Sequence, residues 1–265
     1  MFPILIRLGP FTLHTYGLMV ALGIFAALKM LISQAAKDGY SGSEVEESLS
    51  SLVVYIAVWG ILGARLFYVV THWSEFSENL LGILKIWEGG LVFYGGFVAA
   101  AASFFVWRAQ YKSIFKDWKL LADWIAPSIA FGHALGRLGC FAAGCCYGAP
   151  TSLPWAAVFT DPETLAPIGI PLHPTQIYES VFLGCLGFFL LWRLTEARKS
   201  PTRNPGSIFT DYLILYSIGR FALECFRNDE VRIAMLSPGQ IVSILILAVG
   251  IMLKVIQPGS PKNIR

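Results

Sequence analysis

The sequence is poor in charged residues. Asp, Glu, Lys and Arg make up 14% of its 265 residues and 55% are hydrophobic, whereas an average soluble domain carries roughly 25% charged residues. The net charge is only +3, and no run of basic residues is present, so the sequence gives no support to a nucleic-acid-binding protein. This composition predicts one integral membrane domain over residues 1–265 instead of two soluble domains.

The sequence also lacks the features of a cleaved leader and of a repeat protein. No cleavage site of small residues precedes the first apolar run, and the first ten residues hold a single basic side chain, Arg7. We therefore expect that run to be a retained membrane span and not a signal peptide. No internal repeat, low-complexity tract or repeated half-helix pattern of a transporter is visible.

Seven largely apolar stretches are long enough to cross a bilayer, which takes roughly 17–25 residues per helix. They are residues 16–34, 51–70, 89–107, 119–137, 176–194, 207–226 and 237–256. The predicted fold class is therefore all-α, a polytopic membrane protein with about seven transmembrane helices. The prolines between residues 149 and 175 predict a small ordered cap outside the membrane.

Positive side chains cluster in loops 108–119 and 193–206 and in the carboxyl-terminal tail. With seven spans, all three regions lie on one side of the membrane, and the positive-inside rule makes that side cytoplasmic. We therefore expect a multi-pass protein of the bacterial inner membrane with a periplasmic amino terminus and a cytoplasmic carboxyl terminus. Residues of about 138–175 then form the periplasmic cap, and the amphipathic residues 71–88 are typical of an interfacial helix.

A polar, glycine-rich stretch interrupts the apolar sequence at residues 132–148, GHALGRLGCFAAGCCYG. It carries His133, Arg137 and three cysteines where a lipid-facing helix would carry leucine and valine. A guanidinium at membrane depth is costly unless it finds a partner, water or an anionic ligand. This pattern favours a functional site; the other interpretation is an arginine at a helix end among small residues that pack helices.

Further ionisable residues lie inside the expected spans. They are Arg65, Asp123, Glu179, Asp211, Arg220 and Glu224. Arg220 and Glu224 are four residues apart on one helix face and are expected to pair, with Tyr216 on the same face. Arg65 and Asp123 are equally consistent with an interhelical ion pair. Arg137 and Arg220 together suit a lipid phosphate, because a guanidinium binds phosphate through two parallel hydrogen bonds.

Two other motifs contain candidate binding groups. In WEGGLVFYGG, residues 87–96, the glycines break the helix at the start of the third span, where free backbone amides suit an anion. A glycine-rich interfacial turn is the alternative there. In HPTQIYE, residues 173–179, Thr175 is a candidate helix cap and Glu179 follows on the first turns of the helix.

Three cysteines near the expected outer face allow three interpretations. Cys140, Cys145 and Cys146 lie where an oxidising compartment permits a disulfide. The second interpretation is a reactive thiol that carries or accepts a lipid group, and the third is metal ligation together with His133. The spacing C-x4-C-C matches no common zinc pattern, and we expect no metal and no cofactor.

Taken in order, several motifs resemble the bacterial phosphatidylglycerol–prolipoprotein diacylglyceryl transferases. They are TYGLM at 15–19, GARLFYV at 63–69, WEGGLVFYGG at 87–96, LADWIAP at 121–127, GRLG at 136–139, HPTQIYE at 173–179, YSIGRFALECFR at 216–227 and LSPGQIVSI at 236–244. The resemblance covers nearly the whole chain and implies seven spans with the amino terminus outside. It implies an enzyme, embedded among membrane lipids, that moves the diacylglyceryl group of phosphatidylglycerol to the lipobox cysteine thiol of a preprolipoprotein signal peptide.

The match implies which residues serve that reaction. Arg137 and Arg220 are the expected phosphate-handling pair. The other substrate-binding positions that it implies are Tyr16, Arg65, Gly95, Gly96, Cys140, Cys145, Gly148, Glu179, Tyr216 and Glu224. The chain departs from the family pattern where Tyr94 replaces a histidine and Cys145 replaces a glutamate. Cys140 and Ala143 replace asparagines, and His133 is an additional imidazole; Tyr94 and His133 are the expected catalytic replacements.

These departures leave two other functions open. The first is a related membrane enzyme that moves a lipid-derived group to another acceptor through its cysteine cluster. The second is a non-enzymatic lipid-binding or redox-sensing membrane protein that keeps the arginines only to hold a bound lipid. The retained arginines favour an enzyme, whereas the replaced residues favour one of these alternatives.

Overall fold

The computed structural model describes residues 2–9, 11–77, 79–85, 89–227 and 235–257. The described chain is mainly helical, as the sequence predicts. It forms two compact units: the first joins Met1–Asp38 to Asp117–Arg265, and the second is Gly39–Lys116.

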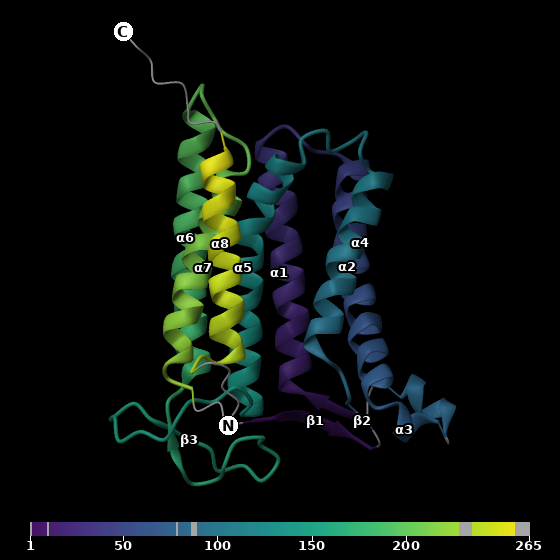
Figure 1. The fold of residues 1–265 in the computed structure, drawn as a ribbon, viewed down its shortest axis with the longest axis vertical. Helices are drawn as coiled ribbons and strands as arrows, with labels where there is room; N and C mark the ends of the chain where they lie inside the picture. The colour runs from purple at the N-terminus through teal and green to yellow at the C-terminus, as the bar shows by residue number, and fades with distance from the viewer. Residues whose placement is uncertain (1, 10, 78, 86–88, 228–234, 258–265) are drawn as a thin grey trace. The chain divides into compact units, whose positions relative to one another are not determined.

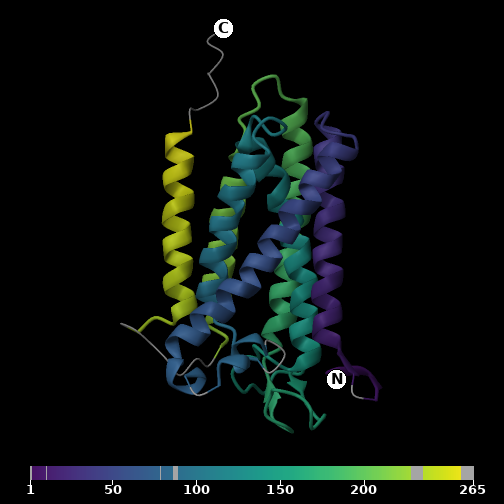
Figure 2. The same cartoon turned by 90° about the vertical axis from the view of Figure 1, so that its right-hand side faces the viewer.

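Long helices that run side by side make up the first unit (Figures 1 and 2). They are α1 (Thr15–Lys37), α5 (Trp118–Ala143), α6 (Thr175–Lys199), α7 (Ser207–Glu224) and α8 (Pro238–Ile256). Helix α5 packs against α1, α6 and α7, and α7 also packs against α6 and α8. The carboxyl end of α5 and the amino ends of α1, α6 and α8 therefore meet at one end of this unit.

Two short β-structures flank these helices. Ahead of α1, β1 (Ile4–Leu8) pairs antiparallel with β2 (Phe11–His14). Between α5 and α6, β3 (Ala157–Val158) pairs with β4 (Pro171–Leu172). This α5–α6 segment lies beyond the lower ends of both helices in Figure 1. It buries Phe159 and Leu172 in a small core of its own, against which Phe141 of α5 packs.

The second unit is built on a pair of packed helices, α2 (Ser43–Thr71) and α4 (Phe93–Gln110). Glycines allow their close approach: a Cβ atom added to Gly95 would lie 2.5 Å from the carbonyl oxygen of Gly63. Between them, α3 (Trp73–Phe76) and the 3-10 helix η1 (Leu80–Leu84) are short and separate. The expected interfacial helix over 71–88 is therefore wrong for the described part, because the backbone of Asn79 leaves the helical conformation.

Long helices occupy all seven stretches that the sequence predicts as spans. Among the described residues, α1, α2, α6 and α8 are long and apolar enough to cross a membrane. The other three long helices, α4, α5 and α7, do not meet that criterion, and α5 and α7 contain the ionisable residues of the candidate site. These findings fit a helical membrane protein, and the number of seven spans stays a prediction.

Candidate active site

The end of α5 presents its polar residues on one side. His133, Arg137 and Cys140 are spaced by four and three residues, which places them on one helix face. The glycine between the last two is needed for packing, because a Cβ atom at Gly139 would lie 2.9 Å from the Cβ of Met19 on α1. Close packing of α1 against α5 thus holds this face in place.

Arg137 forms a buried ion pair with Glu179 of α6. Their Nη2 and Oε1 atoms are 2.9 Å apart, and the two side chains are 14% and 5% exposed. The same carboxylate oxygen lies 3.7 Å from Nε2 of His133. The hydroxyl of Ser180 donates to the carbonyl of Ala134 at 2.9 Å and joins the two helices beside this pair. The buried Nε of Arg137 has no hydrogen-bond partner among the described residues.

Arg220 and Glu224 form the pair that their spacing on α7 predicts. Nη1 of Arg220 lies 2.5 Å from Oε2 of Glu224. The other carboxylate oxygen accepts a hydrogen bond from Ser237 at 3.0 Å, and a Cβ atom at Gly239 would lie 2.6 Å from it. Sequence analysis missed Ser237, although its signal is present: Ser237 and Gln240 form a capping box at the start of α8.

Two arginines are coupled electrostatically to one imidazole. The charges of Arg137 and Arg220 both act on the ring of His133. The ring of Tyr216 lies 6.0 Å from that imidazole and stacks on Tyr212 one turn earlier in α7. Each guanidinium offers five N–H donors, so one carboxylate contact leaves donors for a further anion. The geometry suits a phosphate bound beside His133.

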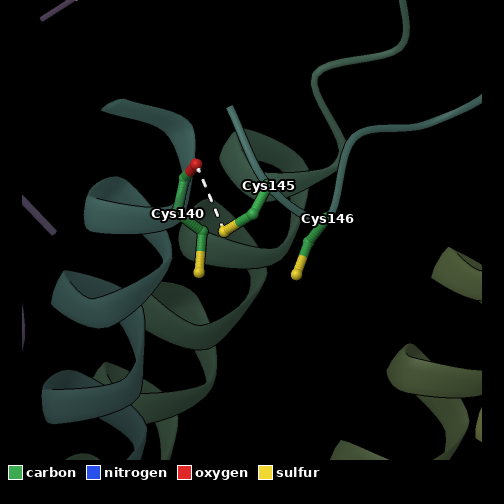
Figure 3. Close-up of side chains that lie close together, drawn as sticks. All are labelled: Cys140, Cys145 and Cys146. Atoms are coloured by element: carbon green, nitrogen blue, oxygen red, sulfur yellow. Dashed lines mark hydrogen bonds between the residues drawn. The ribbon is translucent and has the colours of Figure 1, made fainter. Parts of the chain in front are cut away.

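A turn at the end of α5 brings the three cysteines together (Figure 3). Gly144 adopts a left-handed conformation with φ of 76°, and its amide bonds to the carbonyl of Phe141 at 3.3 Å. The amide of Cys145 bonds to the carbonyl of Cys140 at 3.1 Å, which completes a Schellman motif. The Sγ atoms of Cys140, Cys145 and Cys146 all lie within 4.8 Å of one another. All are free thiols, so the structure holds no disulfide between them.

The beginning of α6 fixes the backbone of this cysteine cluster. The side-chain Nε2 of Gln176 donates to the carbonyl of Cys145 at 2.6 Å, and the hydroxyl of Thr175 donates to the carbonyl of Cys146 at 2.7 Å. The prediction that Thr175 caps α6 is wrong: Pro174 is the N-cap residue, and the hydroxyl bonds to the cysteine loop instead.

Electrostatics distinguishes Cys146 within the cluster. Hydrogen bonds from the neighbouring thiols of Cys140 and Cys145 lower the pKa of the Cys146 thiol, and the charges of Arg137 and Arg227 lower it further, against the effect of burial. Arg227 was not among the predicted site residues, although it is the last residue of the motif at 216–227. The cluster therefore lies within reach of the positive charge of the arginine site.

Tyr16 and Gly148 also lie at this end of the first unit. Tyr16, in the first turn of α1, is 45% exposed and interacts electrostatically with Arg137 and the three thiols. Gly148 is buried, and its amide donates to the carbonyl of His173 at 2.9 Å. A Cβ atom at Gly148 would lie 2.7 Å from the carbonyl oxygen of Phe226, so the position requires glycine for close packing.

Arg65 belongs to the second unit, and its side chain donates hydrogen bonds to backbone carbonyl groups. Its side chain donates to the carbonyls of Gly82, Ile83, Gly89 and Gly90 at 2.6–3.1 Å. The glycine motif therefore presents carbonyls to a cation, whereas the sequence suggested amides for an anion. Gly96 likewise packs helices, because a Cβ atom there would lie 2.9 Å from the carbonyl oxygen of Gly60.

The remaining predicted residues are Tyr94 and Asp123. The side chain of Tyr94 lies outside the described residues. Asp123 accepts hydrogen bonds from the amides of Gly206, Ile208 and Phe209 at 2.8–3.0 Å and so caps the start of α7. The interpretation of Arg65 and Asp123 as partners is wrong, because each is satisfied by backbone groups of its own unit.

The fold and the site define a class of protein. Apolar helices long enough to cross a bilayer accompany two buried arginines, each held by a carboxylate, at one end of a helical unit. In a membrane, such a pair suits the phosphate of a lipid. The first unit is therefore that of a helical membrane protein with two buried arginine–carboxylate pairs at one end.

Comparison with known proteins identifies the family. The family model of prolipoprotein diacylglyceryl transferase matches residues 3–256. The chain is 38% identical over 252 residues to the phosphatidylglycerol–prolipoprotein diacylglyceryl transferase of Clostridium tetani, covering 94% of this chain and 95% of that protein. It is 36% identical over 240 residues to the enzyme of the same name from Finegoldia magna, covering 91% and 89%. The chain belongs to the prolipoprotein diacylglyceryl transferase family, which confirms the resemblance seen in its motifs.

Proposed function

We propose that this protein transfers the diacylglyceryl group of phosphatidylglycerol to the lipobox cysteine thiol of a preprolipoprotein. The products are a thioether on the cysteine and free glycerol 1-phosphate. Membership of the family supports the reaction class, and the names of the relatives state the donor and the acceptor. The lipobox as the acceptor sequence follows from the motif match.

One observation carries this proposal. The charges of Arg137 on α5 and Arg220 on α7 both act on the imidazole of His133, and each arginine is held by a buried carboxylate. Glu179 and Glu224 keep the guanidinium groups in place while no lipid is bound, and they compensate the buried positive charge. A lipid phosphodiester then takes up the donors that one carboxylate leaves unused, including Nε of Arg137.

The arrangement fits the needs of the reaction. The acceptor sulfur attacks the glycerol carbon that bears the phosphate, a C–S bond forms, and the C–O bond to the phosphate breaks. Negative charge grows on the leaving phosphate, and preorganised guanidinium groups stabilise it in the transition state. Arg137 and Arg220 are therefore the residues to which we assign leaving-group stabilisation.

The acceptor thiol must also lose its proton, because the thiolate is the nucleophile. His133 is one candidate for accepting the proton, since the charges of both arginines act on its ring and its Nε2 lies 3.7 Å from Oε1 of Glu179. Tyr94 is the other candidate that the sequence indicates. Tyr16 and Tyr216 are proposed to contact the substrates.

The membrane placement follows the charge distribution. We propose seven spans, a periplasmic amino terminus, a cytoplasmic carboxyl terminus and a cap over residues 138–175 on the periplasmic side of the inner membrane. The two compact units then act as one membrane domain. The site end of the first unit lies with the cap, where a secreted preprolipoprotein becomes accessible.

A reconstituted assay tests the proposal. Purified protein, phosphatidylglycerol and a lipobox peptide should yield a peptide heavier by one diacylglyceryl group, with glycerol 1-phosphate in equal amount. The same gene should restore lipoprotein modification in cells depleted of their own transferase. A lipobox peptide with serine in place of its cysteine is the matched control. Release of glycerol 1-phosphate without a thioether product would contradict the proposed acceptor.

A further inference from the structure

The three-cysteine cluster at the end of α5 has the composition of a metal site. Thiolates are soft ligands that select zinc, copper(I) and related ions. Three protein ligands with one open position are typical of catalytic zinc, whereas structural zinc has four. Cys140, Cys145 and Cys146 supply three sulfur atoms on one short turn.

The distances also suit a metal ion. A zinc–sulfur bond of about 2.3 Å places coordinated sulfur atoms about 4 Å apart. The three Sγ atoms already lie within 4.8 Å of one another, so small side-chain rotations bring them onto a common ion. A disulfide needs two of them at about 2.05 Å, whereas the structure holds all three as free thiols.

The surroundings of the cluster are built to hold it. Cys145 follows a glycine at which a Cβ atom would lie 1.9 Å from Oγ1 of Thr164, so Gly144 is required for the turn. Gln176 and Thr175 fix the carbonyls of the next two residues. Groups of this kind, which orient the ligands without touching the metal, support affinity in metalloproteins.

The charge balance favours a divalent ion. Three thiolates and one divalent cation leave a net charge of −1, a sign that suits a position beside a guanidinium. Metal binding requires the thiolate form of each ligand. Cys140 lies one helical turn beyond Arg137 on the same face of α5, so the metal position adjoins the proposed phosphate site.

We propose that Cys140, Cys145 and Cys146 bind a thiophilic divalent cation, with zinc as the expected ion, whose open position takes the acceptor thiol. This deepens the proposed function and rests on it for the identity of that thiol. Coordination by the metal deprotonates a thiol outright. The site thus supplies the thiolate that attacks the glycerol carbon.

The step balances without an added oxidant or reductant. The acceptor thiol binds the metal as a thiolate and releases its proton to water. Its sulfur then forms the C–S bond to the glycerol carbon, and the electron pair of the broken C–O bond leaves with the phosphate on Arg137 and Arg220. The thioether product is neutral and a weaker ligand, so it leaves the metal.

Protection from alkylation tests the metal site on the unaltered protein. The reduced holoprotein in detergent is treated with a maleimide, with and without zinc, and each cysteine is followed by mass spectrometry. Zinc should slow labelling of Cys145 and Cys146 at least tenfold. Cys185, exposed on α6, serves as the internal control and should react equally in both cases. Equal labelling of all these thiols with and without zinc would overturn the site.

Cobalt binding gives an independent measure. Cobalt(II) should bind at about one ion per chain and show thiolate-to-cobalt charge transfer with the visible bands of a tetrahedral site. Serine at Cys140, Cys145 or Cys146 should weaken binding by about 100-fold or more, and Cys185→Ser should leave it unchanged. Addition of a lipobox peptide should strengthen the charge-transfer band, and a serine peptide should not. Cobalt spectra that are the same in the cluster variants and the parent would contradict the proposal.

Transfer assays separate this inference from the proposed function. Metal-free protein should lose transfer at least tenfold, and zinc should restore it. Transfer at full rate by metal-free protein would overturn the role in thiol activation. Zinc binding without any transfer, in both the loaded and the metal-free protein, would instead contradict the proposed function and leave the metal site standing.

Discussion

Helix α6 carries an ionic cluster near each end, and the two are built differently. Near its carboxyl end, Arg198 donates to Asp38 through Nε and Nη2 at 3.2 and 3.0 Å, and Arg203 and the indole of Trp124 donate to the same carboxylate. Near its amino end, Glu179 pairs with Arg137. Nineteen residues separate Glu179 from Arg198, or about 28 Å along the helix, close to the roughly 30 Å of a bilayer's hydrocarbon core.

Arg198 and Arg137 differ in how many of their hydrogen-bond donors have a partner. Besides its bonds to Asp38, Arg198 donates to the side chain and the carbonyl of Gln34, both at 3.0 Å. Arg137 has one carboxylate, and its buried Nε has no partner among the described residues. Both arginines are about equally buried, at 15% and 14% exposure. Burial alone therefore does not distinguish Arg137 from Arg198, whereas the number of donors in use does.

The largest expected effect separates Arg220 from Arg198. Arg220→Lys should lower the transfer rate by roughly 100-fold to 1,000-fold, because lysine cannot make a bidentate contact to phosphate. Arg198→Lys should leave the rate per folded molecule within about threefold, well short of the loss expected for a transition-state contact. Rates from the reconstituted assay and melting temperatures in detergent are measured together. Equal losses of rate in both variants would remove the distinction drawn from donor use.

The second prediction concerns Asp38 and pH. Asp38→Asn should lower the free energy of unfolding by about 3 kcal/mol at pH 7, because two guanidinium groups lose their shared carboxylate. Burial raises the pKa of Asp38, but hydrogen bonds from Arg203, Arg198 and Trp124 outweigh it, and the net pKa is lowered. A lowered folded-state pKa means that this stabilisation is present above the ordinary carboxyl pKa of about 4.

The pH dependence follows from that sign. As the pH falls through the ordinary carboxyl pKa toward the lower folded-state value, the stability difference between the parent and Asp38→Asn should shrink. Denaturation in detergent from pH 7 down to the acid limit of the preparation measures it. Glu196→Gln, an exposed change on the same helix, is the control and should show little difference at any pH. A difference that grows on acidification would contradict the assigned role of Asp38.

A smaller effect is expected at Asp123, which lies at the same end as Asp38 but has amides as partners. Its carboxylate accepts three hydrogen bonds from the beginning of α7. Asp123→Ala should cost about 2 kcal/mol, the upper range for loss of a helix cap. Asp123→Asn, which keeps one acceptor oxygen, should cost less. Thermal unfolding of both variants decides this, and equal costs would show that the carboxylate is not acting as a cap.

Much of the fold was predictable from hydropathy, since the long apolar stretches leave only helices as spanning structures. The pairing of Arg220 with Glu224 was also predictable, because it depends on spacing within one helix. The partners of Arg65 and Asp123 were not, because they are backbone groups in turns distant along the chain. Arg65 depends on the turn at Gly89 and Gly90, with φ of 92° and 71°.

The cysteine cluster lies between these cases. Its residues were visible, but their spacing left a disulfide, a reactive thiol and a metal ligand open, with the metal ligand the least expected of the three. The Schellman turn at Gly144 decides which atoms meet, and the sequence signal for it is one glycine among the many of this stretch. The hydrogen bonds from Gln176 and Thr175, thirty-one and twenty-nine residues beyond their acceptors, lie outside any local pattern.

The smallest expected effect concerns Lys199, which follows Arg198 on α6. Lys199 pairs with Glu196 at 2.7 Å, but the side chains are 66% and 46% exposed. Water screens such a pair, and its formation immobilises two flexible side chains, so exposed pairs contribute about 0–1 kcal/mol. Lys199→Ala should therefore change the free energy of unfolding by less than about 0.5 kcal/mol, whereas Arg198→Ala, one residue away, should cost several times more. Both are measured by denaturation of the detergent-solubilised protein at low and high salt. A salt-sensitive loss at Lys199 as large as that at Arg198 would mean that proximity of charges, and not the full use of buried donors, holds this end of the unit together.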